Sequence, residues 1–152
     1  MKILVINCGS STIKYQLFDM DSKEVLCSGL VEIGEATSRI THKKFPDTDK
    51  ATKTVIEERF PTHAEGMRKL VEMMMTGDTA VITDISEIAG VGHRVVHGGS
   101  YFKPMVVTDE VIDNLTKVIP LAPLHNPGHL IGIRVAQEIF KNAKHGVVFD
   151  TA

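Results

Sequence analysis

The sequence predicts an α/β fold: a mixed sheet in which a three-strand antiparallel meander is extended by parallel strands, with flanking helices. Alternating or apolar runs over residues 2–8, 13–20 and 24–33 follow one another with only short polar turns between them, which is typical of a meander. Two later apolar runs, 91–97 and 145–149, each follow a segment with helical periodicity. That order is typical of parallel strands joined by crossover helices.

Capping residues mark the starts of the expected helices. Thr62 and Glu65 form a capping-box signature ahead of apolar residues at helical spacing. Thr108 caps a second helix, which carries acidic residues in its first turn. Asn126-Pro127 combines a cap with a proline at the first helical position and opens a third helix.

The segment 34–61 is polar and charged, and we interpret it as a surface insertion within a single domain that spans residues 1–152. Within this segment, 39–43 and 52–56 have the composition of short strands in a surface hairpin.

Composition and charge exclude several classes of protein. The 152 residues are 43% hydrophobic and 24% charged, an ordinary globular balance. A net charge of −2 argues against nucleic acid or a membrane surface as a partner. No apolar run approaches the roughly 20 residues that span a bilayer, and no signal peptide is recognisable. Cys8 and Cys27 form no CxxC pair, so we expect reduced thiols in a cytoplasmic protein, with a reactive Cys8 as the alternative.

The turn between the first two expected strands has the composition of a phosphate site. It contains Asn7, Gly9 and several hydroxyl residues, and the strand that follows carries Lys14. Backbone N–H groups, hydroxyls and an ammonium in one small volume can hold a phosphate. Neither the P-loop nor the dinucleotide fingerprint fits, because a strand rather than a helix follows the turn. Turns of this composition also join strands in proteins that bind nothing.

A second candidate site lies on the strand over 91–97. Arg94 and Val96 share one face, so a guanidinium and an apolar wall are offered to one ligand. A small carboxylate with a short alkyl tail suits that pair. The alternative is an arginine in a structural ion pair.

Asp150 follows the last strand, at the position where α/β sheets usually bind ligands. Its carboxylate can hold Mg²⁺ through water or act as a base, and the alternative is a cap for a following helix. Because the chain stops two residues later, we expect it to be a fragment.

Two histidine pairs have i,i+4 spacing, His93 with His97 and His125 with His129. On helices this spacing suggests zinc, but the first pair lies on an expected strand and no HExxH motif is present. His125 precedes the third helix and can donate to a phosphoryl oxygen.

Four stretches follow one another along the chain: ILVINCGSSTIKYQLFD, GVGHRVVHGGSYF, PLAPLHNPGHLIGI and VVFDTA. In sequence, order and spacing they resemble the acetate kinase family, within the acetate and sugar kinase/heat-shock/actin superfamily. The resemblance implies a ribonuclease H-like fold that forms one lobe of a two-lobe kinase. Residues 1–152 would be the N-terminal lobe, and the C-terminal lobe is absent from this chain. The complete enzyme is expected to be a homodimer.

The resemblance implies roles in binding ATP and magnesium. Asn7 would help to place Mg²⁺. Ser10, Thr12 and Lys14 would contact the phosphates of ATP or ADP. Asp150 would be the acid/base or a water-mediated magnesium ligand, and we favour the second role because acetate is already ionised at pH 7.

The resemblance also implies an acetate site. Arg94 would bind the carboxylate of acetate and then the transferring phosphoryl group of acetyl phosphate. Val96 and Leu124 would line the methyl pocket, and His125 would stabilise the transition state. Cys8 and Gly128-His129 depart from the common family residues near the site. The adenosine loops and further catalytic groups would lie beyond Ala152, so the isolated chain is expected to be inactive.

Two other functions remain open. Propionate kinase would use the same chemistry, and the pocket volume around Val96 and Leu124 would decide between the two acids. A non-catalytic module that binds a phosphorylated metabolite is the second alternative, but it needs neither Arg94 nor Asp150 directed at one pocket.

Overall fold

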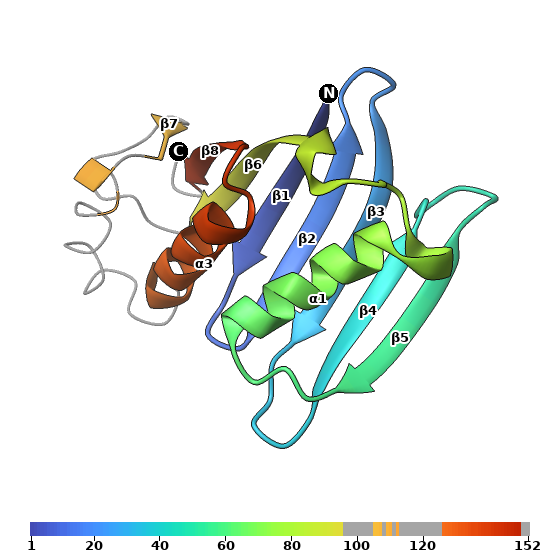
Figure 1. Ribbon diagram of the computed structural model, residues 1–152, viewed down its shortest axis with the longest axis horizontal. Coiled ribbons are helices and arrows are strands. Elements are labelled where there is room, and N and C mark those ends of the chain that lie inside the picture. Colours follow the sequence, from blue (N-terminus) through green and yellow to red (C-terminus); the bar gives the residue numbers. More distant parts are fainter. Residues whose placement is uncertain (96–104, 108, 111, 113–125, 150–152) are drawn as a thin grey trace.

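One mixed sheet organises the molecule, and the computed structural model describes residues 1–95, 105–107, 109, 110, 112 and 126–149. Eight strands in this part of the chain form the sheet in the order β5-β4-β3-β2-β1-β6-β8-β7 (Figure 1). Their bounds are β1 Lys2–Cys8, β2 Thr12–Asp19, β3 Glu24–Glu32, β4 Ser38–Lys44, β5 Thr52–Glu58, β6 Ile88–Val95, β7 Met105–Val106 and β8 Lys144–Phe149. The α/β class predicted from the sequence is confirmed.

The antiparallel meander has five strands instead of the predicted three. β1 to β5 pair consecutively, each antiparallel to the next. The short strands expected at 39–43 and 52–56 are present and slightly longer, but they continue the main sheet. The reason is visible on β4, where Ser38, Ile40 and His42 are buried while Arg39 and Lys43 face solvent. A strand with alternate buried side chains can join a sheet that has one face in solvent, even when its sequence is polar.

The parallel strands lie where the sequence predicted them. β6 pairs with β1, and β8 pairs with β6, both in parallel register. The expected strand at 91–97 begins earlier, at Ile88, and its last two residues lie outside the described part of the chain. The short strand β7, which the sequence did not predict, is antiparallel to β8.

Two helices, α1 (His63–Met75) and α3 (Asn126–Ile139), cover the same face of the sheet (Figure 1). Thr62 caps α1 as predicted, because its side chain accepts a hydrogen bond from the Glu65 backbone N–H. Two 3₁₀ turns, η1 (Gly77–Thr79) and η2 (Ile85–Glu87), lead from α1 to β6. The helix expected from Thr108 lies largely outside the described residues.

The main core fills the space between the sheet and these helices. It includes the fully buried side chains Leu4, Ile13, Leu17, Met67 and Leu70. Both helices lie close to the sheet because glycine faces it. A Cβ at Gly132 of α3 would overlap Cys8 Sγ, and one at Gly66 of α1 would lie 3.1 Å from Val31 Cγ1.

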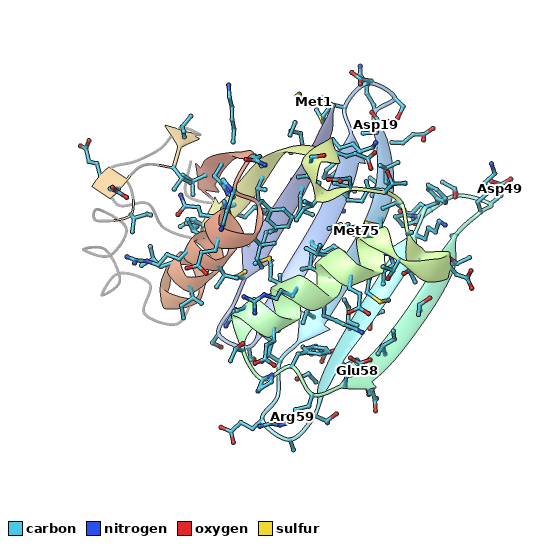
Figure 2. The ribbon with its side chains drawn as sticks, viewed as in Figure 1. Met1, Asp19, Asp49, Glu58, Arg59 and Met75 are labelled. Carbon is cyan, nitrogen blue, oxygen red and sulfur yellow. The ribbon has the colours of Figure 1, made fainter. Side chains whose placement is uncertain are left out.

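Charged residues flank the hairpin formed by β4 and β5. Figure 2 shows Asp49 in the β4–β5 turn and Arg59 just after β5, at opposite ends of that hairpin. The face of the sheet opposite the helices carries the candidate site described next. None of the helices in the described part of the chain is long and apolar enough to cross a membrane.

Candidate functional site

Three of the predicted site residues lie in one line across three strands. Asn7 on β1 is the register partner of Lys14 on β2. On the other side of β1, Ile6 pairs with His93, so continuing the register by one residue brings Asn7 beside Arg94 of β6. Neighbouring strands lie about 4.8 Å apart. Lys14, Asn7 and Arg94 therefore form a contiguous row, the Lys14–Arg94 row.

The row faces away from the helices. Lys14 and Arg94 are exposed and Asn7 is half-buried, whereas their chain neighbours Ile13 and His93 are buried in the layer below the helices. This alternation is what a strand requires, because successive side chains point to opposite faces. The structure therefore places Lys14 and Arg94 on the same face of the sheet, and their roles in binding stay predictions.

A cavity of about 440 Å³ lies over the row. Its lining includes Asn7, Lys14 and Arg94, and also Lys43 and Lys53 from the β4–β5 hairpin. No carboxylate is among the described residues that line it. A concave surface lined by charges of one sign concentrates ions of the opposite sign, so the cavity is suited to an anion.

The turn between β1 and β2 is closed by a backbone hydrogen bond from Gly9 N–H to Thr12 O at 2.9 Å. A Cβ at Gly9 would lie only 2.7 Å from Thr12 Oγ1, so the tight turn favours glycine there. Ser10 and Ser11 are exposed at the tip. This turn, residues 9–12, is the predicted strand–turn–strand connection, and it begins two residues after Asn7 and ends two residues before Lys14.

Two contacts to this turn were not recognised from the sequence. His63 Nε2 lies 2.7 Å from Gly9 O, although the residues are 54 positions apart. Gly128 of α3 approaches the same peptide so closely that a Cβ there would lie 2.7 Å from Gly9 O. The glycine in the first turn of the expected third helix was the only local signal, and nothing local marked His63.

The buried histidines form a chain behind the site. His145 Nε2 donates to Phe140 O at 3.0 Å, which leaves His145 Nδ1 to accept from His93 Nε2 at 3.1 Å. Burial, followed by the nearby His145 and His129, lowers the pKa of His93 to about 3. His93 is therefore neutral at pH 7, and its Nε2 proton makes the hydrogen bond to His145 Nδ1.

Metal binding by the described residues has limited support. No three His, Cys, Asp or Glu side chains among them are grouped so that they could hold a metal ion. Asn7 offers one amide oxygen in the cavity, a donor type that Mg²⁺ accepts.

Cys8 is not a nucleophile in this structure. Its side chain is buried against α3, and burial raises the pKa of the thiol to about 12. A thiol with that pKa is almost entirely protonated at neutral pH. The alternative of a reactive Cys8 in the turn is wrong, because the thiol points to the helix layer instead of the cavity.

Four predicted site residues lie outside the described part of the chain. They are Val96, Leu124, His125 and Asp150. Their roles stay predictions.

The fold and the site together define an α/β domain with a cationic cavity on the open face of a mixed sheet. The chain belongs to the acetokinase family, whose model matches residues 2–152.

Relatives of known name agree with this membership. The chain is 52% identical over 153 residues to the acetate kinase of Nitratidesulfovibrio vulgaris, covering 99% of this chain and 38% of that protein. It is 51% identical over 154 residues to the acetate kinase of Flavobacterium johnsoniae, covering 100% and 38% respectively. The chain thus spans about 38% of the length of these curated relatives.

Solved structures share the fold. The chain superposes on acetate kinase from Porphyromonas gingivalis with a TM-score of 0.92 at 37% identity, covering 99% of this chain and 37% of that one. A propionate kinase from Francisella tularensis gives a TM-score of 0.85 at 33% identity, with the same coverage. The likeness confirms the fold that the resemblance to the family implied.

Proposed function

We propose that the polypeptide carrying this chain transfers a phosphoryl group reversibly between ATP and acetate, giving ADP and acetyl phosphate. In this proposal residues 1–152 supply the half-site for acetate and phosphate. The observation that carries it is the Lys14–Arg94 row, which lies in a cationic cavity beside a phosphate-type turn. The acetate kinases that match the whole chain support the same activity.

The row suits phosphoryl transfer because this reaction asks mainly for positioning and charge neutralisation. Lys14, with Ser10 and Thr12 of the turn, would hold the phosphates of ATP or ADP. Arg94 would hold the carboxylate of acetate through two parallel N–H···O bonds, the geometry that guanidinium favours. Acetate and the transferred group would then lie between two cations on neighbouring strands.

The remaining assignments concern residues outside the described part of the chain. Val96 and Leu124 would line a pocket for the methyl group of acetate. His125 would donate to an equatorial oxygen in the transition state. Asp150 would orient Mg²⁺ through water, since an acid already ionised at pH 7 needs no base.

Magnesium fits the oxygen donors of this half-site. Asn7, through its amide oxygen, and Asp150 would hold it together with phosphate oxygens and water, because Mg²⁺ usually keeps several waters. Bound there, the ion would supply neutralisation of the phosphate charge. The residues of this chain would orient the two substrates around it.

The direct test is turnover by the full-length polypeptide that carries this chain, with Mg·ATP and a series of acetate, propionate and butyrate. We expect the highest kcat/KM for acetate. A maximum at propionate would make the protein a propionate kinase, an outcome made relevant by the propionate kinase neighbour. Binding of acetyl phosphate without turnover of any acid would instead favour the non-catalytic module.

The proposal extends to assembly and location. The complete protein would be a homodimer in the cytoplasm, with ATP, ADP and acetate as its partners and without nucleic-acid or membrane partners. Sedimentation of the full-length polypeptide tests the dimer, and cell fractionation tests the location.

A further inference from the structure

The carbonyl of Gly9 is held from a distant part of the chain. His63, the first residue of α1, is half-buried and places its Nε2 at 2.7 Å from Gly9 O. A carbonyl oxygen only accepts, so Nε2 carries the proton and donates it. Among the described residues, no other side chain makes a hydrogen bond to the turn 9–12.

The helix α3 packs against one face of the same peptide group. A Cβ at Gly128 would lie 2.7 Å from both C and O of Gly9 and 3.1 Å from the Ser10 nitrogen. Contact with all three atoms means that Gly128 packs against the face of the Gly9–Ser10 peptide plane. His63 therefore fixes the direction of the carbonyl, while Gly128 limits the tilt of the plane.

The consequence falls on the amide at the other side of the plane. In a trans peptide the N–H points opposite to the C=O, and no cis peptide bond is present in the described residues. The Ser10 N–H is therefore directed away from His63. It has no acceptor among the described residues. A backbone donor held in this way is the type of group that binds phosphate oxygens.

We propose that His63 is a positioning residue for phosphate binding: by holding the Gly9 carbonyl, it aims the Ser10 N–H at a phosphate oxygen of the nucleotide. The inference deepens the proposed function and rests on it for the identity of the ligand. Without the imidazole donor, the Gly9–Ser10 peptide can rotate, and the Ser10 N–H then no longer points at the phosphate oxygen. Misplacement by about 1 Å in such a site can cost as much as 10²-fold in rate.

The alternative is that His63 only fastens α1 to the sheet. The two roles are separable with His63→Ala, His63→Gln and His63→Asn. Glutamine places an amide N–H near the position of imidazole Nε2, whereas the shorter asparagine side chain does not reach it. His42→Ala is a matched control, since His42 Nε2 also contacts a backbone carbonyl, Thr79 O at 3.2 Å, away from the turn.

The experiment measures Mg·ATP binding to the full-length polypeptide by calorimetry, together with the thermal midpoint of each variant. We expect His63→Ala and His63→Asn to weaken binding by about 10-fold, the cost of roughly one misdirected hydrogen bond. His63→Gln should restore binding to within about 3-fold of the parent. His42→Ala should lower the thermal midpoint at least as much as His63→Ala does, yet leave Mg·ATP affinity unchanged.

Three outcomes would overturn the inference. They are unchanged affinity in His63→Ala, a folded His63→Gln that binds no better than His63→Ala, and absence of Mg·ATP binding in the parent. The proposed function fails separately. If the parent binds Mg·ATP but phosphorylates no carboxylic acid, while His63→Ala still loses affinity and His63→Gln regains it, the positioning role stands without the acetate kinase reaction.

Discussion

His93 and Arg94 are consecutive on β6, yet they serve opposite sides of the sheet. Arg94 is exposed in the cationic cavity, whereas His93 is buried and donates to His145. Strand alternation alone separates them, because neighbouring side chains point to opposite faces. Substitutions at these two positions should therefore have different consequences: one for activity and one for stability.

Replacing Arg94 by alanine should lower kcat by roughly 10²–10³-fold in the full-length polypeptide, as removal of a transition-state donor does. The reason is its position beside Asn7 in the cavity, where the proposed transfer takes place. Steady-state kinetics with acetate measure the effect. Arg94→Lys is the control, since it keeps the charge and loses the paired donors. Near-normal turnover of Arg94→Ala would assign the arginine to a structural role.

Acid should destabilise the folded chain partly through His93. Its pKa is about 3 when folded, so below the unfolded value near 6.5 the unfolded chain binds the extra proton first. Its contribution is therefore complete above about pH 6.5 and decreases as the pH falls towards 3. The loss amounts to at most about 1.4 kcal/mol per pH unit for one proton.

Urea unfolding between pH 7 and pH 4 checks this dependence. His93→Phe removes the titrating group, and its free energy of unfolding should fall less steeply with acid than that of the parent. Equal slopes for the two proteins would show that His93 does not contribute to the acid sensitivity.

At the scale of elements, α3 approaches β1 through glycine. Gly132 leaves no room for a Cβ beside Cys8 Sγ, and Gly128 leaves none beside the Gly9 carbonyl. The helix therefore lies close both to Cys8, the last residue of β1, and to the turn that follows it. The same close approach gives Cys8 its buried, protonated thiol.

Gly132→Ala should destabilise the chain despite the better helix propensity of alanine. Alanine stabilises a helix by about 1 kcal/mol relative to glycine. Forcing an additional methyl group into a filled core, however, destabilises the folded protein by about 1–3 kcal/mol. Urea unfolding measures the net loss. Gly66→Ala is the matched control, because its nearest atoms are methyl groups of Val31 and Ile13 at 3.1 and 3.4 Å, which can adjust.

The cause of the stability loss in Gly132→Ala can be tested by combining this substitution with Cys8→Ala. Removing Sγ relieves part of the overlap, so the double variant should be more stable than the sum of the two single effects predicts. Additive effects would mean that Gly132→Ala acts elsewhere on α3.

At the scale of the whole molecule, charge is unevenly distributed. The chain carries a net charge of −2, yet four cationic side chains line the cavity on the open face. Lys43 and Lys53 are directly opposite one another on β4 and β5. Like charges opposite each other on a sheet are unfavourable, so the basic face has a cost in stability that binding of an anion would offset.

The 152-residue chain by itself should not catalyse the transfer. It spans about 38% of the length of its curated relatives, and the proposed half-site contains the acetate and phosphate groups only. Loss of even one donor costs roughly 2.7–4 kcal/mol of transition-state stabilisation. An assay of the chain with Mg·ATP and acetate checks this, with the full-length polypeptide as the control. Turnover by the chain at about 1–100 s⁻¹, the usual range for kinases, would show that the catalytic groups are complete within these residues.

The sequence by itself determined the local elements. Alternation over 13–20 placed Lys14 on the face opposite Ile13, the capping signature located the start of α1 at Thr62, and glycine and hydroxyl residues marked the turn 9–12. These features depend on residues within a few positions of one another, so periodicity and caps are enough to predict them. The four family motifs predicted the membership that the family match confirms.

Only the tertiary structure decided which distant residues meet. The polar pattern of 34–61 predicted a hairpin but not its pairing with β3, which depends on burial beneath α1. Likewise, the parallel register of β1 and β6 brings Arg94 beside Asn7, and the start of α1 brings His63 to Gly9. The last two contacts join residues more than 50 positions apart. Their partners are selected by the packing of the whole core, because no local preference of either segment specifies the other.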